Sequence, residues 1–510
     1  MPRIEDFKHY IDSFNQNDDE IICQHINNEN AWDFLSGNIP VFHCPDKIME
    51  ETYYFRWWVY RKHVKNTPDG FIITEFLPAV RWAGIHNSIN AAAGHHIYEG
   101  RWLKDKDNIL ENYIRFWFDG KADNSSYSSW LCDAVERFCM VKGDFSSAGD
   151  LLVKMAEWYR KKEETSLHKS ELFWSHDDRD AMEHSISGPG LRPTLNSYMY
   201  GEAKAISAIA ARNGNDDIAE EFSGKAQRIK KLVQDRLWHD KERFFKVIPL
   251  GTVHDEVENW DFAKMDISHN ARELIGYIPW CFGLPDQGYE TAWEQLLDRD
   301  GFYAPFGPAT AEQRHSRFMY KDNHQCLWNG PLWPFATSQT LTAMANLLND
   351  YDQNTISRAH YMELLSAYAR CHYQLDENRN RLSWLDENLD PFTGKWLSRD
   401  ILESRNWPAE KGGRERGKDY NHSTFNDLII SGLIGIRPSE DTVLHINPLI
   451  PSGFWDYFYL GGVFYHGKEI TILYDKDGSC YNKGKGFKVF IDGDEAFRAE
   501  KVQNVRIDIV

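Results

Sequence analysis

A carboxylate placed between two tryptophans marks the stretch of this chain with the clearest chemical potential. Segment 384–396 reads Trp-Leu-Asp-Glu-Asn-Leu-Asp-Pro-Phe-Thr-Gly-Lys-Trp, with Trp384 at its start and Glu387 near its centre. Its Asp-Pro and Thr-Gly pairs are turn-forming residues. Indole rings offer flat apolar faces with a polar edge, which suits the CH faces and hydroxyls of sugars. The segment therefore predicts a catalytic acid or base beside an aromatic, sugar-binding surface.

A second group of carboxylates lies just before the Gly-Pro-Gly turn at 188–190. It combines acidic and basic side chains: Asp177, Asp178, Asp180 and Glu183 with His176, Arg179 and His184. Negative charges held close together raise one another's pKa, which keeps a carboxylic acid protonated near neutral pH. The group therefore predicts a general acid, and a solvated acidic loop that caps a helix is the alternative. Its Asp and His residues lack a recognisable metal-ligand spacing, so we expect no metal and no cofactor.

The elements that must position these carboxylates are mainly helical. Apolar residues recur at i, i+3 and i+4 spacing in the segments 47–64, 87–98, 106–118, 127–142, 147–161, 196–213, 216–237, 269–282, 287–298, 331–349, 355–373 and 422–435. Because these helices show no short sequence repeat, they predict six helical hairpins wound into an (α/α)6 toroid around one funnel. Function is then expected in the long connections, namely 65–86, 163–195, 239–268, 299–330 and 374–421.

The periodicity changes near residue 438. Segments such as Leu444-His-Ile and Glu469-Ile-Thr-Ile-Leu-Tyr alternate apolar and polar residues and are separated by turn dipeptides, a pattern typical of antiparallel strands. We therefore predict three regions: an N-terminal lead-in with a short helix or two (1–45), a helical barrel (46–437) and a small C-terminal β-domain (438–510).

The composition of the chain disfavours some classes of binding partner. The 510 residues include 77 acidic and 58 basic side chains, a net charge of −19 that disfavours nucleic acid and anionic membranes. No apolar run reaches the roughly 18–20 residues of a membrane helix. The first residues contain no apolar leader segment, which favours a cytoplasmic location, although a processed secreted chain would look the same. Eight singly spaced cysteines predict free thiols. The oligomeric state stays open.

Four motifs, in matching order, make the chain similar to a known set of enzymes. Ala181-Met-Glu183-His-Ser185 resembles a Gly-(Met/Trp)-Asp-x-Ser signature, and Glu387-Asn-Leu-Asp-Pro-Phe-Thr-Gly394 resembles Glu-x-Tyr-Asp-Pro-x-Thr-Gly. Trp328-Asn-Gly-Pro-Leu-Trp333 resembles Trp-Arg-Gly-Pro-x-Trp, and 51–58 stands where relatives carry an aromatic wall. The chain thus resembles (α/α)6 glycoside hydrolases of the trehalase and processing α-glucosidase clan (families 37 and 63), closest to mannosylglycerate-hydrolase-like domains.

The resemblance implies an inverting, exo-acting glycoside hydrolase. It assigns the general acid to Glu183 and the general base to Glu387. Inversion places the two carboxyls roughly 6.5–9.5 Å apart, which leaves room for a water molecule. Position 183 holds Glu where the pattern has Asp, so Asp180 stays an alternative acid.

Other side chains are expected to bind the carbohydrate substrate. They come from the aromatic segment, the loops and the motifs: Tyr54, Arg56, Trp57, Trp58, Glu75, Trp82, Arg192, Trp328, Asn329, Trp333, Trp384 and His422. Each has a structural alternative, because tryptophans also fill cores, arginines also form internal ion pairs, and His422 could fasten the loop below it.

Three other functions remain open at this level. A sugar epimerase would use a histidine pair drawn from His86, His95, His96 and His422. A glycoside phosphorylase would need no base, which leaves Glu387 unexplained. A non-catalytic carbohydrate-binding protein is favoured if Glu387 lies buried in a salt bridge. The sequence does not specify the sugar, the linkage or the anomer.

Overall fold

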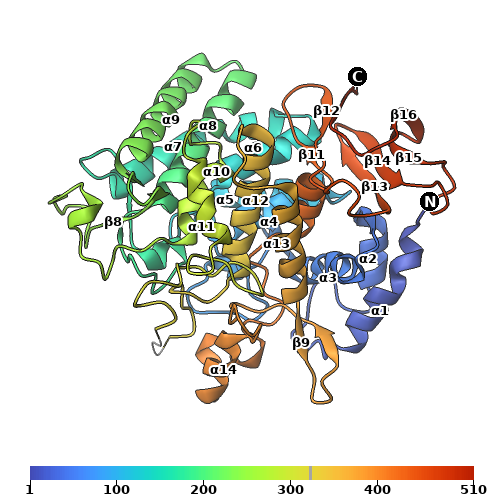
Figure 1. Cartoon of the computed structure of the whole chain (residues 1–510), viewed down its shortest axis with the longest axis horizontal. Coiled ribbons are helices and arrows are strands. Elements are labelled where there is room, and N and C mark those ends of the chain that lie inside the picture. The colour runs from blue at the N-terminus through green and yellow to red at the C-terminus, as the bar shows by residue number, and fades with distance from the viewer. Residues whose placement is uncertain (321–323, 510) are drawn as a thin grey trace.

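The computed structural model describes residues 1–320 and 324–509, which form a helix-rich fold with small antiparallel sheets (Figure 1). A helix overlaps every segment predicted to be helical: α3 (Lys47–His63), α4 (Ala93–Gly100), α5 (Lys106–Phe118), α6 (Leu131–Lys142), α7 (Ser146–Ser166), α8 (Pro193–Arg212), α9 (Asp216–Arg236), α10 (Ile278–Cys281), α11 (Glu294–Leu297), α12 (Pro334–Asp350), α13 (Arg358–Cys371) and the π-helical turn η9 (Leu428–Leu433). Helices α1 (Lys8–Gln16) and α2 (Ala31–Asn38) precede them, and α14 (Leu397–Ser404) lies in the long loop 374–421.

Some helices are shorter than predicted, for local reasons. The segment 87–98 becomes helical only at Ala93, because His86 and Asn87 have left-handed backbones with φ of 58° and 63°. Within 269–282, α10 begins at Ile278 beside Pro279. Proline lacks the amide hydrogen that an interior helical position must donate, so it is tolerated in a first turn.

Alternate helices contact one another in a continuous series. Helix α4 contacts α6, α6 contacts α8, α8 contacts α10, α10 contacts α12, and α12 contacts η9. The series returns to α4 through buried polar contacts: Glu99 accepts hydrogen bonds from the Asn426 and Asp427 amides at 3.0 and 2.9 Å, and Arg101 pairs with Asp427 at 2.7 Å. These contacts link α4, α6, α8, α10, α12 and η9 to one another.

The antiparallel strands predicted after residue 438 are present. Strands β13 (Tyr457–Tyr465), β14 (Lys468–Asp475), β15 (Gly486–Ile491) and β16 (Asp494–Ala499) form consecutive antiparallel pairs. The first of them also pairs with β1 (Val41–His43), so the sheet lies beside the N-terminal helices (Figure 1). A second sheet contains β11 (Ile436–Arg437), β12 (Val443–Ile446) and β17 (Val505–Asp508). One hydrophobic core includes residues of both regions, and the three-part division stays a prediction.

Two further observations concern the whole chain. All eight cysteines are free. Within the described part of the chain, none of the helices combines the length and the apolarity needed to cross a membrane.

Candidate active site

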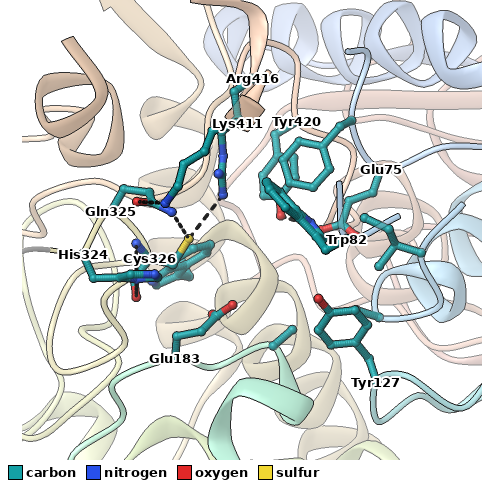
Figure 2. Close-up of a pocket in the computed structure, with 15 residues that line it drawn as sticks. Glu75, Trp82, Tyr127, Glu183, His324, Gln325, Cys326, Lys411, Arg416 and Tyr420 are labelled. Atoms are coloured by element: carbon teal, nitrogen blue, oxygen red, sulfur yellow. Dashed lines mark hydrogen bonds between the residues drawn. The ribbon is translucent and has the colours of Figure 1, made fainter. Parts of the chain in front are cut away.

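A cavity of about 230 Å³ opens among the long loops (Figure 2). Four of the five connections predicted to carry function contribute to its lining, and 239–268 does not. The segments predicted to be helical contribute Ile89, Ala91, Tyr127 and Trp333. The other lining residues are Glu75, Phe76, Trp82, Ala181, Glu183, His324, Gln325, Cys326, Lys411, Arg416 and Tyr420. Segments separated by hundreds of residues therefore meet at one place. The lining combines aromatic rings with carboxyl and cationic groups, the set of groups that a sugar with many hydroxyls requires.

Glu183 points into this cavity, between Cys326 on one side and Tyr127 on the other (Figure 2). The backbone around it is unusual, since Ala181 and His184 have φ of 56° and 59°. These left-handed residues turn the chain sharply on both sides of Glu183, and the Glu183 carbonyl accepts a 3.1 Å hydrogen bond from the amide of Trp328. Burial, together with the negative charges of Asp178 and Glu387, raises the pKa of Glu183 to about 8.

Glu387 is fully buried and forms an ion pair with Arg416. Its Oε1 lies 2.5 Å from Arg416 Nε, and its Oε2 lies 3.5 Å from Cys326 Sγ. Arg416 and Cys326 both line the cavity, whereas Glu387 is not among the lining residues. The ion pair of Glu387 with Arg416 is the buried salt bridge that the sequence analysis associated with a non-catalytic binding protein.

Glu75 is a second carboxyl group in the lining of the cavity. Its Oε1 accepts a 2.5 Å hydrogen bond from the Tyr420 hydroxyl. Its Oε2 is buried, and within residues 1–320 and 324–509 it has no hydrogen-bond partner. Burial raises the pKa of Glu75 to about 7 despite the opposing effect of the Tyr420 hydrogen bond. A buried oxygen without a partner at the wall of a cavity is a suitable acceptor for a ligand hydroxyl.

Aromatic rings form the wall around Glu75. Phe76 lies edge-on to Trp82, with centroids 5.8 Å apart, and packs against Tyr420 at 4.6 Å. The guanidinium of Arg416 lies 4.8 Å from the centre of the Trp82 ring. Trp333, also in the lining, stacks on Trp328 with centroids 4.6 Å apart. Of the predicted substrate-binding residues, Glu75, Trp82 and Trp333 therefore lie at the cavity.

Asp180 and Arg192 lie elsewhere. The two side chains are fully buried and pair with each other at 2.6 Å. Asp180 also accepts hydrogen bonds from the hydroxyls of Ser128 and Ser175 at 2.6 and 2.8 Å. Because both Asp180 oxygens have hydrogen-bond partners, Asp180 stabilises the loop below Glu183, together with Arg192.

Predicted residues of helix α3 also lie away from the cavity. Tyr54 donates a hydrogen bond to the carbonyl of Phe42 at 2.8 Å. The Arg56 guanidinium bonds the carbonyl of Ser423, Trp57 is fully buried, and Trp58 Nε1 donates to Asn15 Oδ1 at 2.8 Å. These side chains pack the interior because nearly all of α3 is buried, which corrects our placement of this helix at the sugar.

Four other predicted substrate-binding residues lie next to the site without lining the cavity. Trp328 stacks on Trp333, and Asn329 Nδ2 donates a hydrogen bond to the carbonyl of Tyr320 at 2.8 Å. Trp384 lies under the guanidinium of Arg399, at 5.0 Å. His422 is buried with its Nε2 3.3 Å from the carbonyl oxygen of Glu387. None of these four is among the lining residues.

Several lining side chains were not predicted from the sequence: Tyr127, Cys326, Lys411, Arg416 and Tyr420. Lys411 Nζ donates a 2.9 Å hydrogen bond to Gln325 Oε1, which ties two loops together. Lys411 and Arg416 lie in a glycine-rich charged run, 410–419, within the long connection 374–421 in which function is expected. Nothing in the sequence distinguishes Cys326 from the other seven cysteines.

The four histidines named as candidates for an epimerase, His86, His95, His96 and His422, are not among the lining residues. His86 pairs with Asp69 at 2.7 Å, and His96 bonds Tyr113 and the carbonyl of Asn421.

Outside the cavity, His176, Asp177 and Asp178 place potential metal-ligand atoms within 4.8 Å of one another. Exposed acidic groups often cluster in this way without an ion.

Two carboxyl groups in different electrostatic states, beside an aromatic cavity in a helix-rich fold, are typical of a glycosidase site. Residues 86–423 match the model of the mannosylglycerate hydrolase MGH1-like glycoside hydrolase domain. The chain belongs to this family, and the match includes both Glu183 and Glu387.

Solved structures agree with this fold. A protein called a sialidase is 41% identical, with a TM-score of 0.90, and is matched over 100% of this chain and 45% of its own length. The chain therefore spans less than half of that protein. The GH63 mannosylglycerate hydrolase from Thermus thermophilus, in complex with glucose, is 12% identical with a TM-score of 0.51, over 74% of this chain and 99% of its own. A GH78 family rhamnosidase of Bacillus sp. GL1 is 11% identical with a TM-score of 0.58, over 86% and 40%.

Proposed function

We propose that the chain is an inverting, exo-acting glycoside hydrolase in which Glu183 is the general acid and Glu387 the general base. The observation that carries the proposal is the contrast between the two carboxyl groups. Glu183 lines the cavity with a pKa raised to about 8, so it holds a proton at neutral pH. Glu387 is instead buried and accepts a 2.5 Å hydrogen bond from Arg416 Nε.

In the proposed reaction, Glu183 protonates the glycosidic oxygen as the bond to the anomeric carbon breaks. Glu387 removes a proton from water, which attacks the opposite face of the sugar through an oxocarbenium-like transition state. Glu75 accepts a hydrogen bond from a sugar hydroxyl, and Trp82 and Trp333 provide apolar surface. The reaction as written requires no cofactor. A cavity of about 230 Å³ supports binding of one terminal sugar residue.

We further propose that the helices form an (α/α)6 toroid. The series α4, α6, α8, α10, α12 and η9, in which each element contacts the next, supports this architecture. So does the return from η9 to α4 through Glu99 and Arg101. The lining residues then come from loops at one end of the toroid.

Hydrolysis of a glycoside panel, followed by NMR of the first-formed anomer, tests the proposal. We expect the product to have inverted configuration, and retention would exclude the mechanism. In Glu387→Gln, kcat should fall by about 10²–10⁴-fold while sugar binding is retained. In Glu183→Gln, a leaving group of low pKa should restore part of the rate, because it departs without protonation. If the rescue occurs in Asp180→Asn instead, Asp180 is the acid.

The buried ion pair of Glu387 favours one other candidate, a non-catalytic carbohydrate-binding protein. In that case Glu387 and Arg416 serve only to hold the loops 384–396 and 409–420 together. Unchanged turnover in Glu387→Gln would exclude Glu387 as the base. Absence of turnover by the unaltered chain on every glycoside tested, with measurable sugar binding, would support the binding protein.

A further inference from the structure

One side chain contacts both members of the ion pair at the site. Cys326 Sγ lies 3.5 Å from Glu387 Oε2 and 3.4 Å from Arg416 Nη2. Figure 2 shows the sulfur facing the cavity, beneath Arg416 and beside Gln325, whose Nε2 is 3.7 Å away. Cys326 also lines the cavity, although Glu387 does not. Any molecule in the cavity that reaches Glu387 Oε2 must therefore come close to this sulfur.

The two oxygens of Glu387 are held with different strength. Oε1 accepts a charge-assisted hydrogen bond from Arg416 Nε at 2.5 Å. Oε2 has the thiol of Cys326 as its side-chain partner. Burial and the charge of Glu387 raise the pKa of the Cys326 thiol well above its ordinary value, so the sulfur keeps its hydrogen and donates it. A thiol is a weak donor.

A general base needs one oxygen that water can approach within hydrogen-bonding distance. Because Oε1 is fixed by a strong partner, only Oε2 is available for this contact. Water is a better hydrogen-bond donor than a thiol, so replacing the thiol contact by a water contact at Oε2 loses little. The strong partner meanwhile anchors Oε1.

We propose that Cys326 is a positioning residue that orients Glu387 and leaves its Oε2 accessible to the attacking water. The inference rests on the proposed function, since it takes Glu387 as the base. A stronger donor at position 326 would compete with the water, and a side chain without a donor would leave Oε2 unoriented. A cysteine satisfies both requirements.

Several charged and titratable groups other than Cys326 face Glu387. They come from every segment packed against it: Glu75, Glu183, Asp386, Lys411, Arg416, Tyr420 and, through the Glu387 carbonyl, His422. Substitution at position 326 leaves all of these in place. A change in the pH profile can then be assigned to the donor at Oε2.

The experiment compares Cys326→Ser and Cys326→Ala. The substrate is the para-nitrophenyl glycoside that is hydrolysed fastest in a panel, since its activated leaving group makes the rate depend mainly on the base. The serine hydroxyl is a stronger donor and stabilises the carboxylate, so the ascending limb of the kcat/KM profile should move to lower pH. Alanine removes the donor, so the limb should move to higher pH. We expect kcat to fall by about ten-fold in each variant with KM changed by less than about two-fold.

Cys139→Ser is the matched control, because Cys139 is fully buried in α6 and is not among the lining residues. Its pH profile should match that of the unaltered chain. Circular dichroism and melting temperature establish that each variant is folded. The inference is overturned if the ascending limb of the kcat/KM profile stays in place in folded Cys326→Ser and Cys326→Ala. It is also overturned if the limb moves in the same direction in both variants. Glu387→Gln separates the two proposals. If Glu387→Gln keeps full turnover, Glu387 is not the base. If Glu387→Gln is inactive but the ascending limbs of the two Cys326 variants do not shift, only the role of Cys326 is rejected.

Discussion

At the residue scale, three carboxyl groups near one cavity have different surroundings. Burial raises the pKa of Glu183 to about 8 and that of Glu75 to about 7. Glu387 has a guanidinium at 2.5 Å that neither of the others has. Sites that use one acid and one base depend on such differences in environment. The contrast between Glu183 and Glu387 follows from where Arg416 lies, because its side chain pairs with only one of them.

The pKa of Glu183 leads to a prediction for the pH dependence of activity. An acid must hold its proton, so kcat/KM should decline as the pH rises through about 8. The negative charge of Asp178 contributes to the raised pKa, so Asp178→Asn should move the descending limb to lower pH, by less than about one unit because Asp178 is exposed. Steady-state profiles between pH 5 and 10 measure the shift. Asp477→Asn, an exposed change in the C-terminal region, should leave the limb in place. A limb that moves equally in both variants would indicate a general charge effect.

The unpartnered oxygen of Glu75 leads to a second prediction. In Glu75→Gln an amide group replaces an oxygen that faces the cavity, so a donor stands where a sugar hydroxyl needs an acceptor. We expect KM to rise by about ten-fold, with a smaller change in kcat, because the contact exists in both the ground state and the transition state. Tyr420→Phe is the matched variant: it removes the hydroxyl bound to Oε1 and leaves both Glu75 oxygens in place, so its effect on KM should be smaller. Equal effects of the two changes would contradict a direct sugar contact.

At the element scale, the chain after α14 brings two cations to the cavity. Lys411 and Arg416 both lie there, bound to Gln325 and Glu387. Between them, Gly412 and Gly413 have φ of 93° and 62°. Such backbones are favourable only for glycine. The segment therefore has its conformation fixed by local backbone chemistry as well as by its side-chain contacts.

Gly412→Ala tests this dependence. Its φ is strained for alanine, and an added Cβ would lie 2.9 Å from Pro78 Cγ, whereas a Cβ at Gly413 meets nothing within 4 Å. We expect Gly412→Ala to lower kcat/KM by about ten-fold or more through displacement of Arg416, and Gly413→Ala to have a smaller effect. Steady-state kinetics measure the difference, and the melting temperature shows whether the fold is also affected. If the two variants behave alike, the contact with Pro78 is unimportant.

At the scale of the whole molecule, the two ends of the chain share one sheet. Strand β1 pairs with β13, and Val41 lies opposite Gly461 in the register. Phe42 is fully buried in the same hydrophobic core as residues of the helices. The N-terminal segment is therefore part of the C-terminal sheet. We expect the helices and the sheet to unfold together.

Phe42→Ala tests this coupling. Loss of a fully buried phenylalanine should lower the free energy of unfolding by about 3–5 kcal/mol, and Val41→Ala, at a half-buried position, by about 1 kcal/mol or less. Denaturant unfolding followed by tryptophan fluorescence and circular dichroism measures both, and a single transition is expected in each variant. Two separate transitions in Phe42→Ala would show that the sheet and the helices are independent units, with a boundary near residue 438.

Much of the fold could be predicted from periodicity alone. The positions of the helices and of the strands after residue 438 follow from apolar spacing, which reflects local geometry. The helix ends could not be predicted as well, because the left-handed residues His86 and Asn87 and the placement of Pro279 act over one or two positions. The pairing of β1 with β13 was missed because it joins residues 420 positions apart, as Val41 and Gly461 are.

The sequence by itself determined the residue types and the order of the motifs, and hence the two carboxylates Glu183 and Glu387. The tertiary structure decided which neighbours they have. It paired Arg416 with Glu387 and Asp180 with Arg192, and it buried most of α3 away from the cavity. The physical reason is that the proton affinity and accessibility of a carboxyl group depend on distances of a few ångströms between segments far apart in the chain. Local sequence patterns do not encode those distances.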